Sequence, residues 1–342
     1  MIAPFPWFGG KHPIADRVWD WLGDVNYYIE PFCGSAAVLL ARPEWHRKRH
    51  EIVNDKDCHI ANFWRAMQAA PDEVASYADW PVNHADLSAR HRWLVYSDQA
   101  ANMARRVRHD PHFYDAKIAG WWVWGLSSWI GMGWCHNTGR VRSGRKIPNI
   151  TMTCGCAALR LSDQIPHIAK LRGCASRRLS NQIPQLTIDQ GVHAKTALIH
   201  RFRQLQARLN AVRVCCGDWK RCCSTPSILT HDCGVFLDPP YSAEANREQQ
   251  IYREEDLSVA HEVREWCIAH QHDCKIVLCG YEGEHNELES QHGWRVHQWT
   301  ALGGYANMSG GAGGVGFNNR HRERVWISPL CRGAASGLFA AK

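Results

Sequence analysis

Several features that define whole classes of protein are absent from this sequence of 342 residues. No run of residues approaches the roughly 18 consecutive apolar positions that a membrane-spanning helix needs. The first seven residues have neither the basic start nor the apolar core of a secretory signal. We therefore expect an intracellular protein without a membrane partner.

The sequence contains 15 cysteines, but their arrangement argues against a disulfide scaffold or a zinc site. The count is odd, and residues 215–216 and 222–223 are adjacent pairs. The Cys-Gly-Cys segment at 154–156 is one residue short of a zinc knuckle and has no matching second pair. We expect no metal cofactor and interpret most cysteines as small buried hydrophobic residues.

The composition, 45% hydrophobic and 21% charged, excludes a disordered or fibrous chain. The length is too great for one compact core and too small for two full-sized ones, so we expect a catalytic domain with a large insertion. Residues 86–213 hold 20 lysines and arginines against 6 acidic residues, whereas the remainder holds 20 against 27. This basic middle fits either a module that binds a polyanion or a solvated basic face without a partner.

The alternation of apolar runs with helix-like segments predicts an α/β fold whose sheet is mostly parallel. The segments 234–238 and 275–279 are almost continuously apolar, as strands buried on both faces are. The alternating segments 295–299 and 324–328 predict an antiparallel hairpin near the C-terminal end. The remaining predicted strands are 27–30, 51–55 and 212–216, and the predicted helices are 36–40, 62–69 and 258–270.

Two segments outside this sheet allow two interpretations each. The tryptophans at 121–124, 129 and 134 can form a helical core or a base-stacking platform, and we favour the helical core. The glycine-rich segment 303–316 can close over a ligand or simply form the tip of the hairpin.

The tetrad Asp238-Pro239-Pro240-Tyr241 follows a predicted buried strand, where open α/β sheets bind their ligands. An exocyclic amino group of a base is a poor nucleophile because its lone pair is delocalised into the ring. A carboxylate and the Pro239 carbonyl, accepting its two hydrogens, would free that lone pair for attack. The Tyr241 ring offers a face for a flipped base. An ordinary strand-ending turn is the alternative, since Asp-Pro is common in turns.

Two further motifs suit a nucleoside-containing ligand. Glu30-Pro31-Phe32-Cys33-Gly34-Ser35 follows the first strand, and Asp55 ends the next one, where a carboxylate can hold a ribose. The segment Pro6-Trp7-Phe8-Gly9-Gly10-Lys11 combines paired glycines with a cation. No G-x-G-x-x-G follows directly on a predicted strand, so a dinucleotide fingerprint is absent.

The order of these motifs resembles the Dam-like, alpha-class adenine-N6 DNA methyltransferases, and most of all their phage and prophage members. In that family a Gly-Gly-Lys motif, an E/D-P-F-x-G-S motif, a target-recognition insertion and D-P-P-Y follow one another. They match residues 6–11, 30–35, about 80–210 and 238–241 here. Lesser matches are Asn54-Asp55, Gly217-Asp218-Trp219 and 322–326, so the resemblance spans nearly the whole chain.

The resemblance implies a Rossmann-like, S-adenosylmethionine-dependent methyltransferase sheet with a large, mainly helical target-recognition insertion. Residues 1–79 and 211–332 would form the catalytic domain, 80–210 the DNA-binding insertion and 333–342 a flexible tail. The cofactor S-adenosylmethionine would be bound by the matching motif residues, namely Trp7, Gly9, Gly10, Lys11, Glu30, Pro31, Phe32, Gly34, Asp55, Asp218 and Trp219.

Within this set the family implies particular roles. Asp55 would bind the ribose, and Asp218 with Trp219 would lie near the cofactor adenine. The catalytic residues would be Asp238, Pro239, Pro240 and Tyr241. Ala36 departs from the pattern because many relatives have a glycine there, which would tighten the cofactor loop. Cys33 lies inside that loop, and we interpret it as a packing residue rather than a nucleophile.

The implied activity is transfer of a methyl group to the N6 amino group of adenine in DNA, by base flipping and direct in-line displacement. Three alternatives remain: an RNA adenine acceptor, a cytosine-N4 acceptor, which Asp238 disfavours, and a DNA-binding relative without activity. We expect DNA as the partner, no obligate protein partner, a monomer or weak dimer, and the cytoplasm of a bacterium or phage-infected cell. Whether a restriction enzyme accompanies it is open.

Overall fold

A computed structural model describes most of the chain outside the segment 136–190. The described residues are 1, 3–5, 7, 10–47, 49–129, 134–135, 191–224, 230–241, 259–300 and 321–333, with only the backbone for 191–195. The predicted cofactor residue Gly9, the glycine-rich segment 303–316 and all of the predicted tail except Gly333 lie outside these residues.

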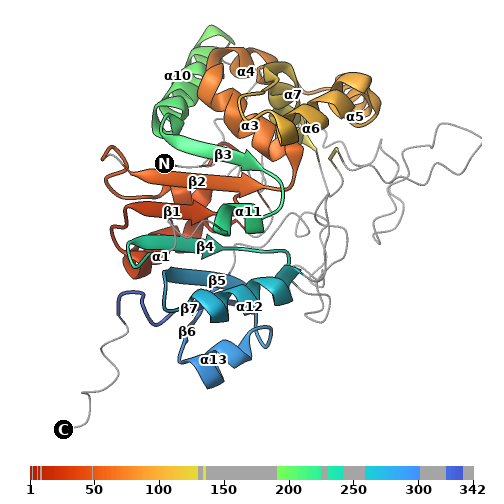
Figure 1. The fold of residues 1–342 in the computed structure, drawn as a ribbon. Helices are drawn as coiled ribbons and strands as arrows, with labels where there is room; N and C mark the ends of the chain where they lie inside the picture. The colour runs from red at the N-terminus through yellow and green to blue at the C-terminus, as the bar shows by residue number, and fades with distance from the viewer. Residues whose placement is uncertain are drawn as a thin grey trace, which may run out of the picture.

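A seven-stranded sheet forms the centre of the molecule, with the strand order β3-β2-β1-β4-β5-β7-β6 (Figure 1). Pairing is parallel from β3 to β5, and β7 pairs antiparallel with both β5 and β6. Every strand expected from the sequence is present, and the mostly parallel sheet with its antiparallel hairpin is confirmed. The strands are β1 Tyr27–Glu30, β2 His50–Asp55, β3 Val212–Cys216, β4 Cys233–Leu237, β5 Lys275–Tyr281, β6 Arg295–Gln298 and β7 Glu323–Ile327.

Alternate residues of the central strands feed two hydrophobic clusters, one on each face of the sheet. Phe236 of β4 joins the cluster that contains α1 (Ala15–Leu22) and α2 (Ala37–Leu40). Its neighbours Val235 and Leu237 join the cluster that contains α12 (Val259–His270). Because successive strand side chains point to opposite faces, a strand buried on both faces reads as a continuous apolar run. The expectation for 234–238 is therefore confirmed, since every residue of β4 is buried.

The helix after β2 begins earlier than its predicted start at Asn62. The α3 helix extends over Cys58–Ala69 because Asp57 caps it, accepting a 2.8 Å hydrogen bond from the backbone N–H of His59. A capping aspartate satisfies a donor that the first helical turn leaves unpaired. The remaining helices are the 3₁₀ turn η1 His12–Ile14, α4 Pro71–Ala78, α5 His84–Tyr96, α6 Asp98–His109, α7 Ala116–Ser128, α10 Gly191–Leu209, α11 Lys220–Cys223 and α13 Asn286–His292.

The helices α5, α6, α7 and α10 come from the segment predicted as an insertion. They pack with α3 and α4 beyond the β3 edge of the sheet, and their buried residues belong to the same cluster as those of α3 (Figure 1). Trp122 and Trp124 of α7 are 2% and 1% exposed, which confirms the tryptophan cluster as helical core. The boundaries 80–210 remain a prediction, because much of that segment lies outside the described residues.

The cysteines of the described residues are free thiols, and all except the half-buried Cys215 are buried. This agrees with their interpretation as small hydrophobic residues. No helix within the described part of the chain is both long and apolar enough to cross a bilayer.

A buried ion triad links the start of β2 to Arg42, just after α2, and to Arg208 of α10. The Glu51 carboxylate accepts hydrogen bonds from Arg42 Nη1 at 3.0 Å and from Arg208 Nη1 at 2.6 Å. All three side chains are at most 4% exposed. Each buried charge therefore has a partner of opposite sign, although two guanidinium groups share one carboxylate.

Candidate functional site

A pocket lies at the carboxyl ends of the parallel strands, where the strand order reverses between β1 and β4. Open α/β sheets bind ligands at this switch point, because the connections from the two central strands leave toward opposite faces. The pocket holds about 1070 Å³, part of it open to solvent. Its lining includes Trp7, Gly10, Lys11, Glu30, Pro31, Phe32, Gly34, Asp55, Asp218, Trp219, Asp238 and Pro240.

The structure therefore brings the tetrad next to two motifs that lie about 200 residues or more before it in the sequence. Every predicted cofactor residue that the structure describes lines this one pocket. Of the tetrad, Asp238 and Pro240 line it, whereas Pro239 is buried and Tyr241 is half-buried immediately behind. The sequence analysis did not identify other pocket residues, among them Asp57 and Ile60.

Gly34 packs closely against Trp7 of the first motif. Its φ of +44° is in the left-handed region that favours glycine. A β-carbon there would lie 2.5 Å from Cδ1 of Trp7, so only glycine allows the indole to cover the loop. Trp64 of α3 holds the other side, donating from Nε1 to the Gly34 carbonyl at 2.9 Å.

Ala36, where many relatives of the resembled family have glycine, also adopts a left-handed conformation, with φ of +50°. The β-carbon makes this conformation about 1–2 kcal/mol less favourable than for glycine. The chain therefore keeps the turn that a glycine would favour and accepts strain in it.

Glu30 at the end of β1 is almost fully buried, with 2% exposure. Its Oε2 accepts hydrogen bonds from the Tyr28 hydroxyl at 2.9 Å and from the Leu39 N–H at 3.1 Å. Burial raises the pKa of Glu30 to about 8, despite these bonds. A cation bound beside it would favour the ionised form.

Asp55 at the end of β2 holds the motif loop in place. Its Oδ2 accepts from the Gly34 N–H at 3.0 Å and its Oδ1 from the Asp57 N–H at 2.9 Å. Burial raises the pKa of Asp55 to about 7. Each carboxylate oxygen has a second lone pair, so the group can still accept hydrogen bonds from ligand hydroxyls.

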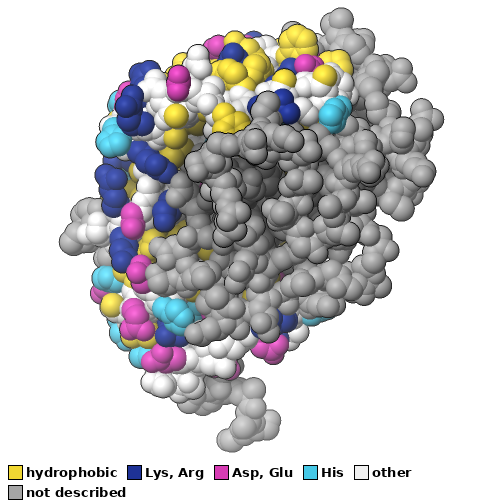
Figure 2. All heavy atoms as spheres, turned by 90° about the vertical axis from the view of Figure 1, so that its right-hand side faces the viewer, with side chains coloured by type: hydrophobic (Ala, Val, Ile, Leu, Met, Phe, Trp, Pro, Cys, Tyr) yellow, Lys and Arg dark blue, Asp and Glu magenta, His cyan; other side chains and the backbone are white. Residues whose placement is uncertain are grey.

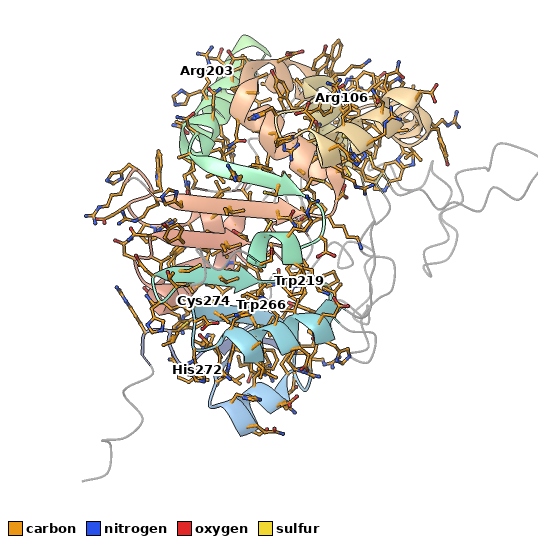
Figure 3. All side chains as sticks on the ribbon, viewed as in Figure 1. Arg106, Arg203, Trp219, Trp266, His272 and Cys274 are labelled. Atoms are coloured by element: carbon orange, nitrogen blue, oxygen red, sulfur yellow. The ribbon has the colours of Figure 1, made fainter. Side chains whose placement is uncertain are left out.

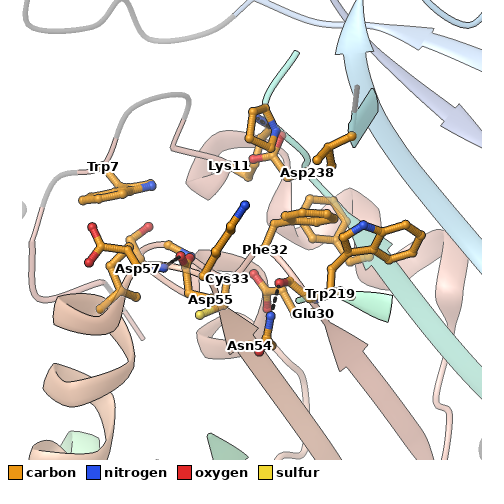
Figure 4. Close-up of a pocket in the computed structure, with 18 of the residues that line it drawn as sticks. Trp7, Lys11, Glu30, Phe32, Cys33, Asn54, Asp55, Asp57, Trp219 and Asp238 are labelled. Carbon is orange, nitrogen blue, oxygen red and sulfur yellow. Dashed lines mark hydrogen bonds and ion pairs between the residues drawn. The ribbon is translucent and has the colours of Figure 1, made fainter. Parts of the chain in front are cut away.

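Asn54, beside Asp55, joins two of the pocket loops. Its buried Nδ2 donates to the Pro31 carbonyl and to the Gly217 carbonyl, each at 3.0 Å (Figure 4). The loops after β1 and β3 are thereby fixed to β2, which lies between them. The sequence contained this residue in a lesser motif match, but nothing in its spacing indicated a link to both loops.

The far wall of the pocket is aromatic. Figure 4 shows Phe32 and Trp219 next to each other, with Trp7 on the opposite side. The Phe32 and Trp219 ring centroids are 5.9 Å apart, and Trp266 of α12 supports Trp219 from behind at 6.1 Å (Figure 3). Exposed Asp218 accepts from the Lys220 N–H at 2.8 Å and so fixes the turn before α11. Such walls suit a flat heteroaromatic ring.

Lys11 crosses from the first motif to the tetrad. Its Nζ lies 2.9 Å from Asp238 Oδ1 and donates to the Tyr241 hydroxyl at 3.1 Å. Burial alone would lower the pKa of Lys11, but the carboxylates of Asp238 and Glu323 outweigh burial and raise it. Lys11 is therefore a fixed positive charge on Oδ1 of Asp238, while Oδ2 makes no hydrogen bond to any described residue.

Glu323, the first residue of β7, completes this group of contacts. It pairs with Tyr281 of β5 in the sheet, and its Oε2 accepts from the Tyr241 hydroxyl at 2.7 Å. The sequence contained Glu323 within a matching segment but indicated no role for it. Burial raises the pKa of Glu323, and the nearby Lys11 offsets this effect only in part.

Cys33 is buried against the pocket, and burial raises the pKa of its thiol well above the ordinary range. A protonated, buried thiol is a poor nucleophile. The interpretation of Cys33 as a packing residue is confirmed.

Carboxylates dominate the charge of the pocket. Among the described residues that line it, six are acidic and two are lysines, Lys11 and Lys56. A site of this sign attracts a cationic ligand.

Figure 2 views the molecule toward the carboxyl ends of the parallel strands. Lys and Arg side chains form a column along the left margin of this view.

The model of the D12 class N6 adenine-specific DNA methyltransferase family matches residues 7–99. This agrees with the resemblance to Dam-like adenine methyltransferases and supports DNA adenine methylation as the general activity. The matched segment contains the first two motifs and Asp55, whereas the tetrad lies beyond it. A search of the curated proteins found no match to the chain.

Proposed function

We propose that this protein transfers a methyl group from S-adenosylmethionine to the N6 amino group of an adenine that is flipped out of DNA. One observation carries the proposal. Asp238 lines the same pocket as the predicted cofactor residues, with Lys11 on one of its oxygens and the other without a hydrogen bond to any described residue.

The residues of the pocket fit S-adenosylmethionine. This molecule, when bound, supplies an electrophilic methyl group on a positively charged sulfur. The excess of carboxylates suits its two positive charges, and Asp55 can accept hydrogen bonds from its ribose hydroxyls. Phe32 and Trp219 offer an apolar wall for its adenine. The tight contact of Gly34 with Trp7 leaves no side chain at position 34 between the loop and the pocket, so the loop could lie close to a bound ligand.

Asp238 would position the target base. Its Oδ2 would accept one hydrogen of the amino group and the Pro239 carbonyl the other, which frees the nitrogen lone pair for attack. The ion pair with Lys11 orients Asp238, so little reorganisation accompanies the reaction. No covalent enzyme intermediate is needed. We propose that the Tyr241 ring contacts the base, while its hydroxyl is held by Lys11 and Glu323.

The proposed DNA partner is supported by exposed arginines in the predicted insertion. Arg105, Arg106 and Arg108 are exposed in the last two turns of α6, and Figure 3 labels Arg106 there. Arginine side chains at such positions can contact phosphates, which would position the duplex without reading its sequence. Binding should therefore weaken steeply with salt.

Nucleoside mass spectrometry tests the proposal. Unmethylated duplex DNA is incubated with S-adenosylmethionine and either the wild-type protein, Asp238→Asn or Asp273→Asn. Asp273 is an exposed aspartate in the turn before β5, at the opposite end of the sheet from the pocket, and so serves as the matched control. We expect N6-methyldeoxyadenosine from the wild type and the control but not from Asp238→Asn.

Other outcomes would each reject a defined part. Near-normal activity of Asp238→Asn would reject the catalytic role of Asp238. Methylation of RNA but not DNA in a parallel incubation would change the acceptor, and N4-methylcytosine would change the base. If the wild type shows no activity and calorimetry detects binding of DNA but not of S-adenosylmethionine, the protein is a DNA-binding protein without methyltransferase activity.

A further inference from the structure

Methylation of an amino group releases a proton. The nitrogen that bonds to the methyl carbon carries a positive charge until it loses one of its hydrogens. Asp238 is the carboxylate beside it, but Asp238 must be ionised again before the next amino group can bind. A second group within reach that takes the proton from Asp238 would restore the site.

One hydroxyl group connects Asp238 to a second carboxylate. The Tyr241 hydroxyl lies 3.3 Å from Asp238 Oδ1 and 2.7 Å from Glu323 Oε2. Proton transfer requires groups within hydrogen-bond reach, about 2.6–3.2 Å between heavy atoms. The contact with Glu323 lies inside this range, and the contact with Asp238 lies at its upper limit. The three groups thus form a continuous path from the pocket to β7.

We propose that Glu323 is the terminal acceptor of the proton that the target amino group loses, and that Tyr241 carries this proton from Asp238. The proposal rests on the proposed methyl transfer. The nitrogen lone pair forms the bond to the methyl carbon, and the electrons of the carbon–sulfur bond remain on sulfur. The nitrogen then gives one proton to Asp238.

The proton continues along the hydrogen-bonded path. The Asp238 carboxyl group turns about its Cβ–Cγ bond and presents the proton to the Tyr241 oxygen, while Tyr241 passes its own hydroxyl proton to Glu323. Asp238 is again a carboxylate, Tyr241 is unchanged, and Glu323 is a neutral carboxylic acid. Glu323 returns the proton to water before the next cycle, so the charges balance.

The surroundings of Glu323 make it a suitable acceptor. Its side chain is 5% exposed, and burial disfavours its charged form and so strengthens its affinity for a proton. Lys11 lies 4.0 Å away and is already protonated, so it orients the path but cannot accept. The titratable groups around Glu323 come from three segments, namely Lys11, then Asp238 and Tyr241, then Cys279, Tyr281 and Glu284.

Rapid-quench kinetics on DNA with the variants Glu323→Gln and Glu323→Asp test this role. Glutamine keeps the shape and the acceptor oxygen for Tyr241 but cannot take a proton. We expect Glu323→Gln to form the first equivalent of N6-methyladenine at close to the wild-type rate. Later turnovers should slow by at least about tenfold, a bound set below the roughly 100- to 10,000-fold that general acid–base groups typically contribute.

The pH profile separates proton transfer from mere positioning. In Glu323→Gln, Asp238 must lose its proton directly to solvent, so the steady-state rate should rise with pH more steeply than in the wild type. Glu323→Asp should recover part of the rate. Glu282→Gln is the matched control, because Glu282 is an exposed carboxylate on the same edge that pairs with Arg324 at 2.8 Å. It should behave as the wild type.

A turnover-independent measurement completes the test. Infrared difference spectra during a pH titration should show a carboxyl band, absent in Glu323→Gln, that is protonated above the usual range of a glutamic acid. Steady-state rates of Glu323→Gln that equal those of the wild type at every pH would overturn the proposal. So would a first turnover in Glu323→Gln that slows as much as the later ones. A carboxyl band of Glu323 that titrates in the usual range of a glutamic acid would also overturn it. A wild type that makes no N6-methyladenine would reject the proposed function itself.

Discussion

The indole of Trp7 packs so closely on Gly34 that a β-carbon at position 34 would lie 2.5 Å from Cδ1 of the ring. Two motifs therefore share a contact, between residues 27 positions apart, that only glycine permits. The contact forms one wall of the pocket, so a change there should affect ligand binding as well as stability.

Gly34→Ala should weaken S-adenosylmethionine binding by tenfold or more and lower the free energy of unfolding by about 1–3 kcal/mol. The cost combines the left-handed backbone with displacement of the Trp7 ring. Gly293→Ala is the control, since Gly293 is also left-handed with φ of +69° but has nothing within 4 Å of its β-carbon position. Calorimetry and urea unfolding measure both variants. Unchanged affinity in Gly34→Ala would show that the Trp7 contact does not shape the site.

Cofactor affinity should increase as the pH is raised from about 6 to 9. The pKa is about 8 for Glu30 and about 7 for Asp55, both raised by burial, so both bind protons near neutrality in the free protein. A bound cation favours their charged forms and lowers both pKa values, so binding releases protons. Affinity can then rise by up to about tenfold per pH unit for each proton released.

Calorimetry in buffers of different ionisation enthalpy counts the protons released on binding. Glu30→Gln should flatten the affinity profile near pH 8, and Asp55→Asn near pH 7. A profile without pH dependence in the wild type would mean that neither carboxylate approaches the positive charge of the ligand.

Asn54→Ala should destabilise the protein by about 2–3 kcal/mol, because the buried Pro31 carbonyl and the partly buried Gly217 carbonyl lose their donor. It should also weaken cofactor binding, since the loops at Pro31 and Gly217 are no longer joined. Asn54→Asp should be worse than alanine, because a carboxylate would face two carbonyl oxygens. Asn102→Ala, at an exposed asparagine of α6, is the control. If Asn54→Ala and Asn102→Ala weakened cofactor binding equally, the proposed role of Asn54 in joining the loops would be wrong.

Glu51→Gln should lower the free energy of unfolding by about 3–5 kcal/mol, as expected when one partner of a buried ion group is removed. The variant leaves the guanidinium groups of Arg42 and Arg208 buried with a neutral partner. Asp72→Asn, which breaks the exposed pair with Arg203, should leave the urea midpoint unchanged. If both variants unfold at the wild-type midpoint, the triad contributes nothing to stability.

The sheet and most of the pocket could be predicted because local patterns determine them. The apolar run before Asp238 identifies a buried strand, and the carboxyl end of such a strand is where ligands bind. Charge and glycine placement similarly located Asp55 and Gly34. These inferences require only the period of the side chains and the direction of parallel strands.

The contacts that depend on strand register could not be predicted. Glu323 reaches Tyr241 only because β7 pairs with β5 in a register that places Glu323 opposite Tyr281. The family resemblance implied that Lys11 lies in the cofactor pocket, and Lys11 does line the pocket. Nothing in the sequence indicated its ion pair with Asp238, which is 227 positions away. The early start of α3 was missed because Asp57 was not recognised as its cap.

The position of β7 between β5 and β6 has a consequence for the order in which the protein can be completed during synthesis. β6 leaves the ribosome before β7, yet it pairs with β7 and not with β5. β6 can therefore join the sheet only after β7 has been synthesised. The same strand delivers Glu323 to Lys11 and Tyr241. A nascent chain can bury its parallel strands early, but the full set of contacts around Lys11 and Tyr241 forms only when residue 323 has emerged.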